Sequence, residues 1–79
     1  MDSKEILNII ETTLQSGSKI PGLFDLPKIL SVKSEIQACT SIKDVLAIVE
    51  EHRPFISKAF GLSEDNIEQT IQKIKALEG

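Results

Sequence analysis

The amino-acid sequence predicts an all-α protein, a compact orthogonal bundle of four to five short helices. Apolar residues recur at helical spacing along several stretches, and a residue that can cap a helix precedes most of them. The composition, 41% hydrophobic and 27% charged over 79 residues, is typical of a folded globular chain. With no internal repeat and no linker, we expect residues 1–79 to form a single helical domain.

Composition and charge argue against several classes of function. The net charge of -3 comes from twelve acidic and nine basic residues spread along the chain, so no basic stripe is available to neutralise phosphates. Cys39 is the only cysteine and His52 the only histidine, which leaves no cluster with zinc-ligand spacing. No apolar run approaches the ~20 residues that span a bilayer, and the chain opens acidic and polar. We therefore expect a cytoplasmic protein without cofactors, metals or membrane association.

The first helix is expected to begin at Asp2. Asp2 and Glu5 have the spacing of a capping box, and Met1 against Ile6 would form the adjacent hydrophobic staple. Gly17 is placed to end the helix as the residue after its last turn. The apolar face consists of Ile6, Leu7, Ile9, Ile10 and Leu14.

A loop over residues 16–23 is predicted from its glycines and proline, and its apolar residues suggest that it lies against the core. Asp25 is expected to cap the second helix, with Phe24 stapled to Ile29 and Pro27 tolerated in the first turn. The buried stripe of this helix comprises Leu26, Ile29, Val32, Ile36 and Cys39, so Cys39 is interpreted as a buried structural thiol. Residues 22–33 also resemble short amphibian membrane-active peptides, but the proline and the acidic balance favour an ordinary core helix.

Ser41 and Asp44 predict the start of a third helix, which should end near His52 because Pro54 disfavours helical geometry at Arg53. His52 and Arg53 would then complement the dipole at its end. The apolar face of this helix is Ile42, Val45, Leu46, Ile48 and Val49.

A separate short helix is expected over residues 54–60. Gly61 then supplies a left-handed turn, and Ser63 caps the last helix, with Leu62 stapled to Ile67. The buried seam of the last helix consists of Ile67, Thr70, Ile71, Ile74 and Leu77.

The corner between the last two segments, Ile56 to Ile74, resembles the helix-turn-helix of bacterial response-regulator output domains, quorum-sensing activators and the related sigma-factor region. The resemblance depends on a small residue at the helix crossing, the glycine turn, the serine cap and the core anchors of the second helix; these residues are Ser57, Phe60, Gly61, Leu62, Ser63, Ile67, Ile71 and Ile74. It implies that exposed residues of the last helix, namely Asn66, Gln69, Thr70 and Lys73, read the major groove of DNA. Three acids, Glu64, Asp65 and Glu68, lie where phosphates would come closest, which disfavours nucleic acid as a partner.

Surplus apolar residues indicate the function that the sequence favours. Not all of them fit inside five short helices, and exposed apolar surface on a small protein marks a partner site. The residues expected at this site are Ile20, Leu23, Phe24, Leu30 and Phe55. We therefore expect a small non-enzymatic protein-interaction or regulatory module, with a protein partner or a second copy of itself and no small-molecule substrate; the alternative is DNA binding through the helix after Ser63.

Overall fold

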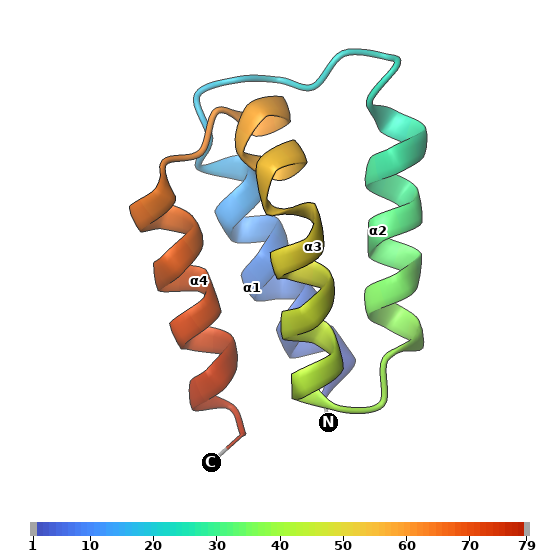
Figure 1. The fold of residues 1–79 in the computed structure, drawn as a ribbon, viewed down its shortest axis with the longest axis vertical. Helices are drawn as coiled ribbons and strands as arrows, with labels where there is room; N and C mark the ends of the chain where they lie inside the picture. The colour runs from blue at the N-terminus through green and yellow to red at the C-terminus, as the bar shows by residue number, and fades with distance from the viewer. Residues whose placement is uncertain (1, 79) are drawn as a thin grey trace.

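The computed structural model describes residues 2–78 and contains four helices in an up-down-up-down order (Figure 1). They are α1 (Ser3–Gln15), α2 (Leu26–Ala38), α3 (Ile42–Phe60) and α4 (Glu64–Ala76). The molecule measures 35 × 24 × 19 Å, and residues 2–78 include no strand. The predicted all-α class is therefore confirmed, with four helices.

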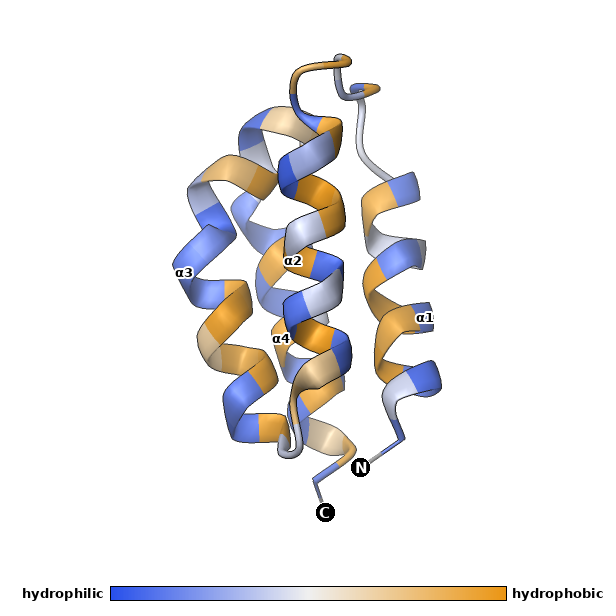
Figure 2. Ribbon diagram, turned by 90° about the vertical axis from the view of Figure 1, so that its right-hand side faces the viewer, coloured by the Kyte–Doolittle hydropathy of each residue, from blue (hydrophilic) through white to orange (hydrophobic). Residues whose placement is uncertain are grey.

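The four helices pack around one core. Helix α1 contacts each of the other three, whereas α2 and α4 lie at opposite corners without a close backbone approach in the described part of the chain. Figures 1 and 2 show the axes of all four helices running roughly along the long dimension of the molecule. Neighbouring helices therefore cross at smaller angles than in the predicted orthogonal bundle. Over residues 2–78, no helix has the length and apolarity needed to cross a bilayer.

Three of the four expected N-caps are confirmed. The Asp2 carboxylate accepts hydrogen bonds from the backbone N–H groups of Lys4 and Glu5, while Ser41 and Ser63 accept them from Asp44 and Asn66. These bonds satisfy N–H groups that have no partner within the helix. The staple expected between Met1 and Ile6 lies outside the described residues.

The expected cap and staple at the start of α2 are wrong. Asp25 precedes the helix but its side chain makes no capping hydrogen bond, and Phe24 is fully exposed instead of packing on Ile29. A turn closed by the Asp25 N–H and the Gly22 carbonyl, at 3.0 Å, leads into the helix in their place. Pro27 stands in the first turn, as expected, where its missing N–H costs no hydrogen bond.

The predicted break at Pro54 is also wrong, because α3 continues through it to Phe60. The upper part of α3 bends in both views (Figures 1 and 2), as is usual for a proline within a helix. Buried residues lie on both sides of the proline, Val49 before it and Ala59 after it, so the core holds both halves in one helix. His52 therefore lies inside α3, where its Nε2 is 3.3 Å from the Glu35 carboxylate of α2.

Gly61 ends α3 in the left-handed conformation, as predicted, with φ 65° and ψ 45°. The N–H groups of Gly61 and Leu62 both donate to the Ser57 carbonyl, which is the hydrogen-bond pattern of a glycine-terminated helix. The Ser57 hydroxyl donates to the Leu62 carbonyl at 2.8 Å and closes the corner.

Gly17 has a different role from the predicted one. Helix α1 ends at Gln15. Among residues 2–78 only Gly61 is a glycine with a positive φ, so Gly17 does not adopt the left-handed conformation. A Cβ atom at position 17 would instead collide with the carbonyl group of Phe60. Glycine is needed here because two backbone segments meet without space for a side chain.

The core is formed by aliphatic side chains from all four helices and the corner. Its most enclosed members are Ile6, Ile36, Val45 and Ile74. The complete buried apolar set is Ile6, Ile10, Ile29, Val32, Ile36, Val45, Val49, Ala59, Leu62, Ile67, Ile71 and Ile74. Leu26 and Leu77, which the helical spacing placed on buried stripes, are 43% and 37% exposed because they lie at helix ends.

Candidate functional site

The loop between α1 and α2 carries the most exposed large apolar side chains of the described chain. Ile20 is 95% exposed, Leu23 83% and Phe24 100%. Leu26 and Leu30, one helical turn apart on α2, are 43% and 65% exposed and extend the apolar area along that helix. We call these five residues the loop surface; Figure 2 shows its apolar ribbon at one end of the molecule. The expectation that the loop lies against the core is wrong.

The base of this loop is held by the corner between α3 and α4. The N–H groups of Ser18 and Lys19 donate to the carbonyls of Gly61 and Phe60, at 3.3 and 3.0 Å. The Ser18 hydroxyl also donates to the Gly61 carbonyl. The close approach at Gly17 makes these bonds possible, so the apolar part of the loop projects from an anchored base.

Phe55 differs from the other four residues predicted at the partner site. It is half-buried, and Lys28 Nζ lies 4.6 Å from the centroid of its ring. A cation over an aromatic face is favourable, by about 0.5–1 kcal/mol at an exposed site. Four of the five predicted residues, Ile20, Leu23, Phe24 and Leu30, are therefore exposed, and Phe55 lies beside Ile20 under a lysine.

Two hollows flank the loop. One, about 450 Å³ in volume, lies between α1, α2 and the loop, and Leu14, Pro21, Leu26, Ile29 and Phe60 contribute its apolar lining. The other, about 380 Å³, lies between the loop and α3 and has a more polar lining, which includes Ile20, Phe55, Lys19, Lys58 and Asp25. Sequence reasoning missed Leu26, Lys19 and Lys58 at this site. No local signal identifies Lys58, because only the fold brings α3 beside the loop.

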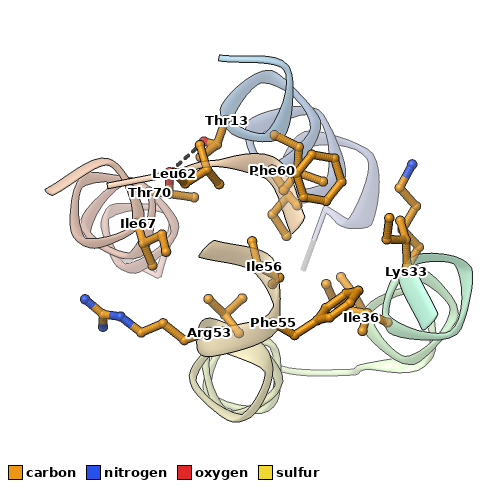
Figure 3. A pocket seen from close by; sticks show the side chains of 15 residues that line it. Thr13, Lys33, Ile36, Arg53, Phe55, Ile56, Phe60, Leu62, Ile67 and Thr70 are labelled. Carbon is orange, nitrogen blue, oxygen red and sulfur yellow. Dashed lines mark hydrogen bonds between the residues drawn. The ribbon is translucent and has the colours of Figure 1, made fainter. Parts of the chain in front are cut away.

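A smaller cavity of about 40 Å³ lies inside the bundle (Figure 3). Ile56, Phe60, Leu62 and Ile67 point into it, and a hydrogen bond of 2.6 Å between the hydroxyls of Thr13 and Thr70 lies in its wall. Pockets for small molecules usually have about 300–1,000 Å³. This cavity is a packing gap, and it offers a ligand almost no polar group.

The four residues predicted to read DNA lie along the groove between α1 and α4. Thr70 is buried and bonded to Thr13, Asn66 is half-buried, and Gln69 and Lys73 are exposed. A hollow of about 240 Å³ is lined by all four, together with Ile9, Thr12 and Thr13 of α1 and its C-cap Ser16. The expected exposure of Thr70 is therefore wrong, and its place on the buried seam is confirmed.

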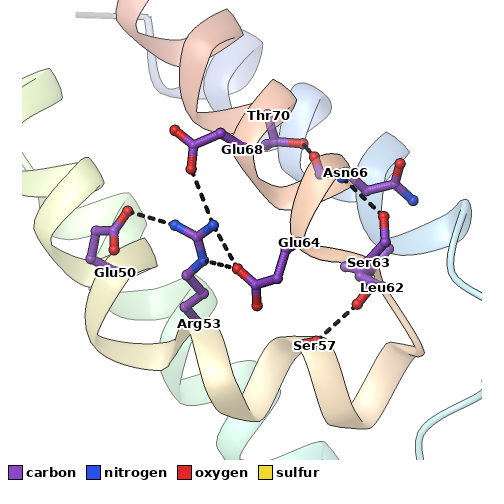
Figure 4. A network of polar contacts seen from close by, with 9 residues as sticks. All are labelled: Glu50, Arg53, Ser57, Leu62, Ser63, Glu64, Asn66, Glu68 and Thr70. Atoms are coloured by element: carbon purple, nitrogen blue, oxygen red, sulfur yellow. Dashed lines mark hydrogen bonds and ion pairs between the residues drawn. The ribbon is translucent and has the colours of Figure 1, made fainter.

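Arg53 lies among three glutamates at the junction of α3 and α4 (Figure 4). Its guanidinium lies 2.7 Å from the Glu64 carboxylate and 3.1 Å from those of Glu50 and Glu68. Hydrogen bonds to Glu64 and then Glu68 raise the pKa of Arg53 above its usual range. Arg53 thus joins the two helices, and it does not mark the end of a helix as the sequence had suggested.

Cys39 is half-buried at the edge of the core, less enclosed than predicted, and its thiol donates to the Glu35 carbonyl at 3.2 Å. Desolvation, followed by the negative charges of Asp44 and Glu35, raises the pKa of this thiol above its ordinary value of 9.0. The folded state therefore holds the thiol proton more tightly. This contribution to stability is present below pH 9.0 and is lost as the pH rises through the raised pKa.

Slow alkylation of Cys39 is the expected result. At pH 8 the thiolate fraction is smaller in the folded protein than in the urea-unfolded chain, so iodoacetamide should react more slowly with the folded protein. The two rates should converge as the pH rises beyond the raised pKa. Mass spectrometry over a series of pH values measures both, and equal rates at pH 8 would contradict the assignment.

These features define a small four-helix bundle with an exposed apolar surface anchored at one end. Comparisons with protein-family models, curated proteins and solved structures find no match to this chain. The helix-turn-helix resemblance of residues 56–74 therefore stays a prediction.

Proposed function

We propose that this protein is a cytoplasmic, non-enzymatic interaction module that binds a protein partner through the loop surface. The complete exposure of Phe24, which follows Leu23 at 83% and Ile20 at 95% in the same loop, is the observation that supports this proposal most directly. Burying one large apolar side chain is worth about 1.5–3 kcal/mol, which this chain forgoes at three nearby positions. Clustered apolar surface of this kind is typical of a binding site.

The cost is large for a chain of this size. A protein of 79 residues is stabilised by roughly 4–12 kcal/mol in total, so several exposed apolar side chains represent a substantial part of that margin. The anchored base further supports a binding role, because a loop held in one conformation loses little entropy when a partner covers it.

A capture experiment from the native host tests the proposal, with Phe24→Ser and Gln72→Ser as matched variants. Both positions are exposed, so neither change should alter the free energy of unfolding by more than about 0.5 kcal/mol. We expect the wild type and Gln72→Ser to retain the same protein, with or without nuclease, and Phe24→Ser to lose it. Retention by Phe24→Ser, or loss on nuclease treatment, would contradict the proposal.

A further inference from the structure

The shape of the loop surface restricts what can cover it. Ile20, Leu23 and Phe24 project from the loop, and a hollow lies on each side of it, about 450 Å³ toward α1 and α2 and about 380 Å³ toward α3. A partner must therefore cover projecting side chains and also fill concave sites. An amphipathic helix does both, since its apolar residues at positions i, i+3, i+4 and i+7 form a ridge of separate side chains. A bilayer surface presents no side chains of this kind.

The backbone around this site is already ordered. Hydrogen bonds tie Ser18 and Lys19 to the α3–α4 corner, and a bond between the Asp25 N–H and the Gly22 carbonyl closes the other end of the loop. Proline fixes φ at positions 21 and 27. A partner helix can therefore bind to a preformed surface.

The charges around this site differ in sign from those of the rest of the molecule. Four lysines adjoin the loop surface and its hollows, namely Lys19, Lys28, Lys33 and Lys58, against two acids, Glu11 and Asp25. Lys33 pairs with Glu11 at 3.1 Å, so Lys19, Lys28 and Lys58 dominate. The remainder of the chain has five basic and ten acidic residues. A net excess of positive charge is thus found at the end that carries the exposed apolar residues, whereas the remainder of the chain is net negative.

This charge pattern separates a second copy of the chain from a different partner. A two-fold dimer would place the same surface against itself, and the lysines around one loop surface would face those around the other. Like charges brought together in an interface oppose association, whereas carboxylates on a partner would complement them.

We propose that the loop surface binds an amphipathic helix of a partner protein, with apolar residues along one face and acidic residues beside them. The apolar face covers Phe24 and its neighbours and places side chains in the hollow between α1, α2 and the loop, whose lining is mainly apolar. The flanking carboxylates pair with Lys19, Lys28 and Lys58. This inference depends on the proposed function and adds the chemical class of the partner.

Two matched peptides test the inference. Each is an amidated helix of about 18 residues, long enough to be helical in isolation, with leucines on one face and one tryptophan among them. One carries glutamate and the other lysine at the flanking positions. The protein contains no tryptophan and no tyrosine, so the peptide indole is the fluorophore that a titration follows.

We expect a blue shift of the indole emission and about tenfold tighter binding of the acidic peptide at low salt. The preference should disappear near 1 M salt, where the Debye length is about 3 Å. Phe24→Ser should weaken binding of the acidic peptide about tenfold or more. The double variant Lys19→Gln and Lys58→Gln should lose the preference, and Lys73→Gln with Lys75→Gln on α4 should keep it.

Several results would overturn the inference. In the titration, they are equal or tighter binding of the basic peptide, and no binding of either peptide at millimolar concentration. In other measurements, they are binding to phosphatidylserine vesicles that depends on Phe24 and occurs without peptide binding, and a dimer in sedimentation that depends on Phe24. The proposed function is judged separately, because Phe24→Ser still releases the captured partner if only the acidic-helix assignment is wrong.

Discussion

Replacing Pro54 with alanine is expected to raise the free energy of unfolding by about 2 kcal/mol. Proline inside a helix costs about 3 kcal/mol relative to alanine, because it removes one backbone hydrogen bond and its ring meets the carbonyl four residues earlier. That carbonyl belongs to Glu50, within the uninterrupted helix Ile42–Phe60. Part of the gain is offset, because alanine gives the unfolded chain more conformational freedom. The added entropy lowers the free energy of the unfolded state by about 0.4–1 kcal/mol.

Pro27→Ala is the matched control. Pro27 occupies the first turn of α2, where no intrahelical hydrogen bond is lost, so its replacement should leave stability unchanged or slightly lower. Denaturation in guanidinium chloride, followed by circular dichroism, measures both variants. A lower stability for Pro54→Ala would show that packing of the second half of α3 requires the bend, and our account of this helix would then be wrong.

Gly17→Ala is expected to lower the free energy of unfolding by about 1–3 kcal/mol or more. The added methyl group would occupy the position of the Phe60 carbonyl, and a backbone atom cannot rotate away as a flexible side chain can. The end of α1 would have to separate from the α3–α4 corner. The Lys19 N–H bond to the Phe60 carbonyl, 3.0 Å long, would be lost with it.

Gly22→Ala separates this clash from a general effect of alanine in the loop. Apart from Gly22 itself and its two neighbours in sequence, no residue has an atom within 4 Å of a Cβ built at position 22, and Gly22 does not have a positive φ. Alanine there should be neutral or stabilise by about 0.4–1 kcal/mol. Thermal unfolding of both variants compares them directly. A similar loss at the two positions would contradict the role assigned to Gly17.

Local signals were sufficient for most of the secondary structure. Ser41, Ser63 and Asp2 cap helices because each side chain bonds to N–H groups two or three residues away, and Gly61 adopts its left-handed turn where the adjoining helix ends. Such interactions involve residues that are close in sequence. Helical spacing likewise identified the buried seam of α4, including Thr70. For the same reason the all-α class could be predicted.

Interactions between distant segments decided the rest. Whether Pro54 breaks a helix depends on whether the core holds both halves together, and local preference alone favours a break. Gly17 is required because Phe60, far along the chain, meets it. The sequence identified Ile20, Leu23, Phe24 and Leu30 as surplus apolar residues, but only packing shows that the loop projects and that Lys58 of α3 lies beside it. Secondary structure follows from neighbours in sequence, whereas a surface follows from which neighbours in space leave a side chain uncovered.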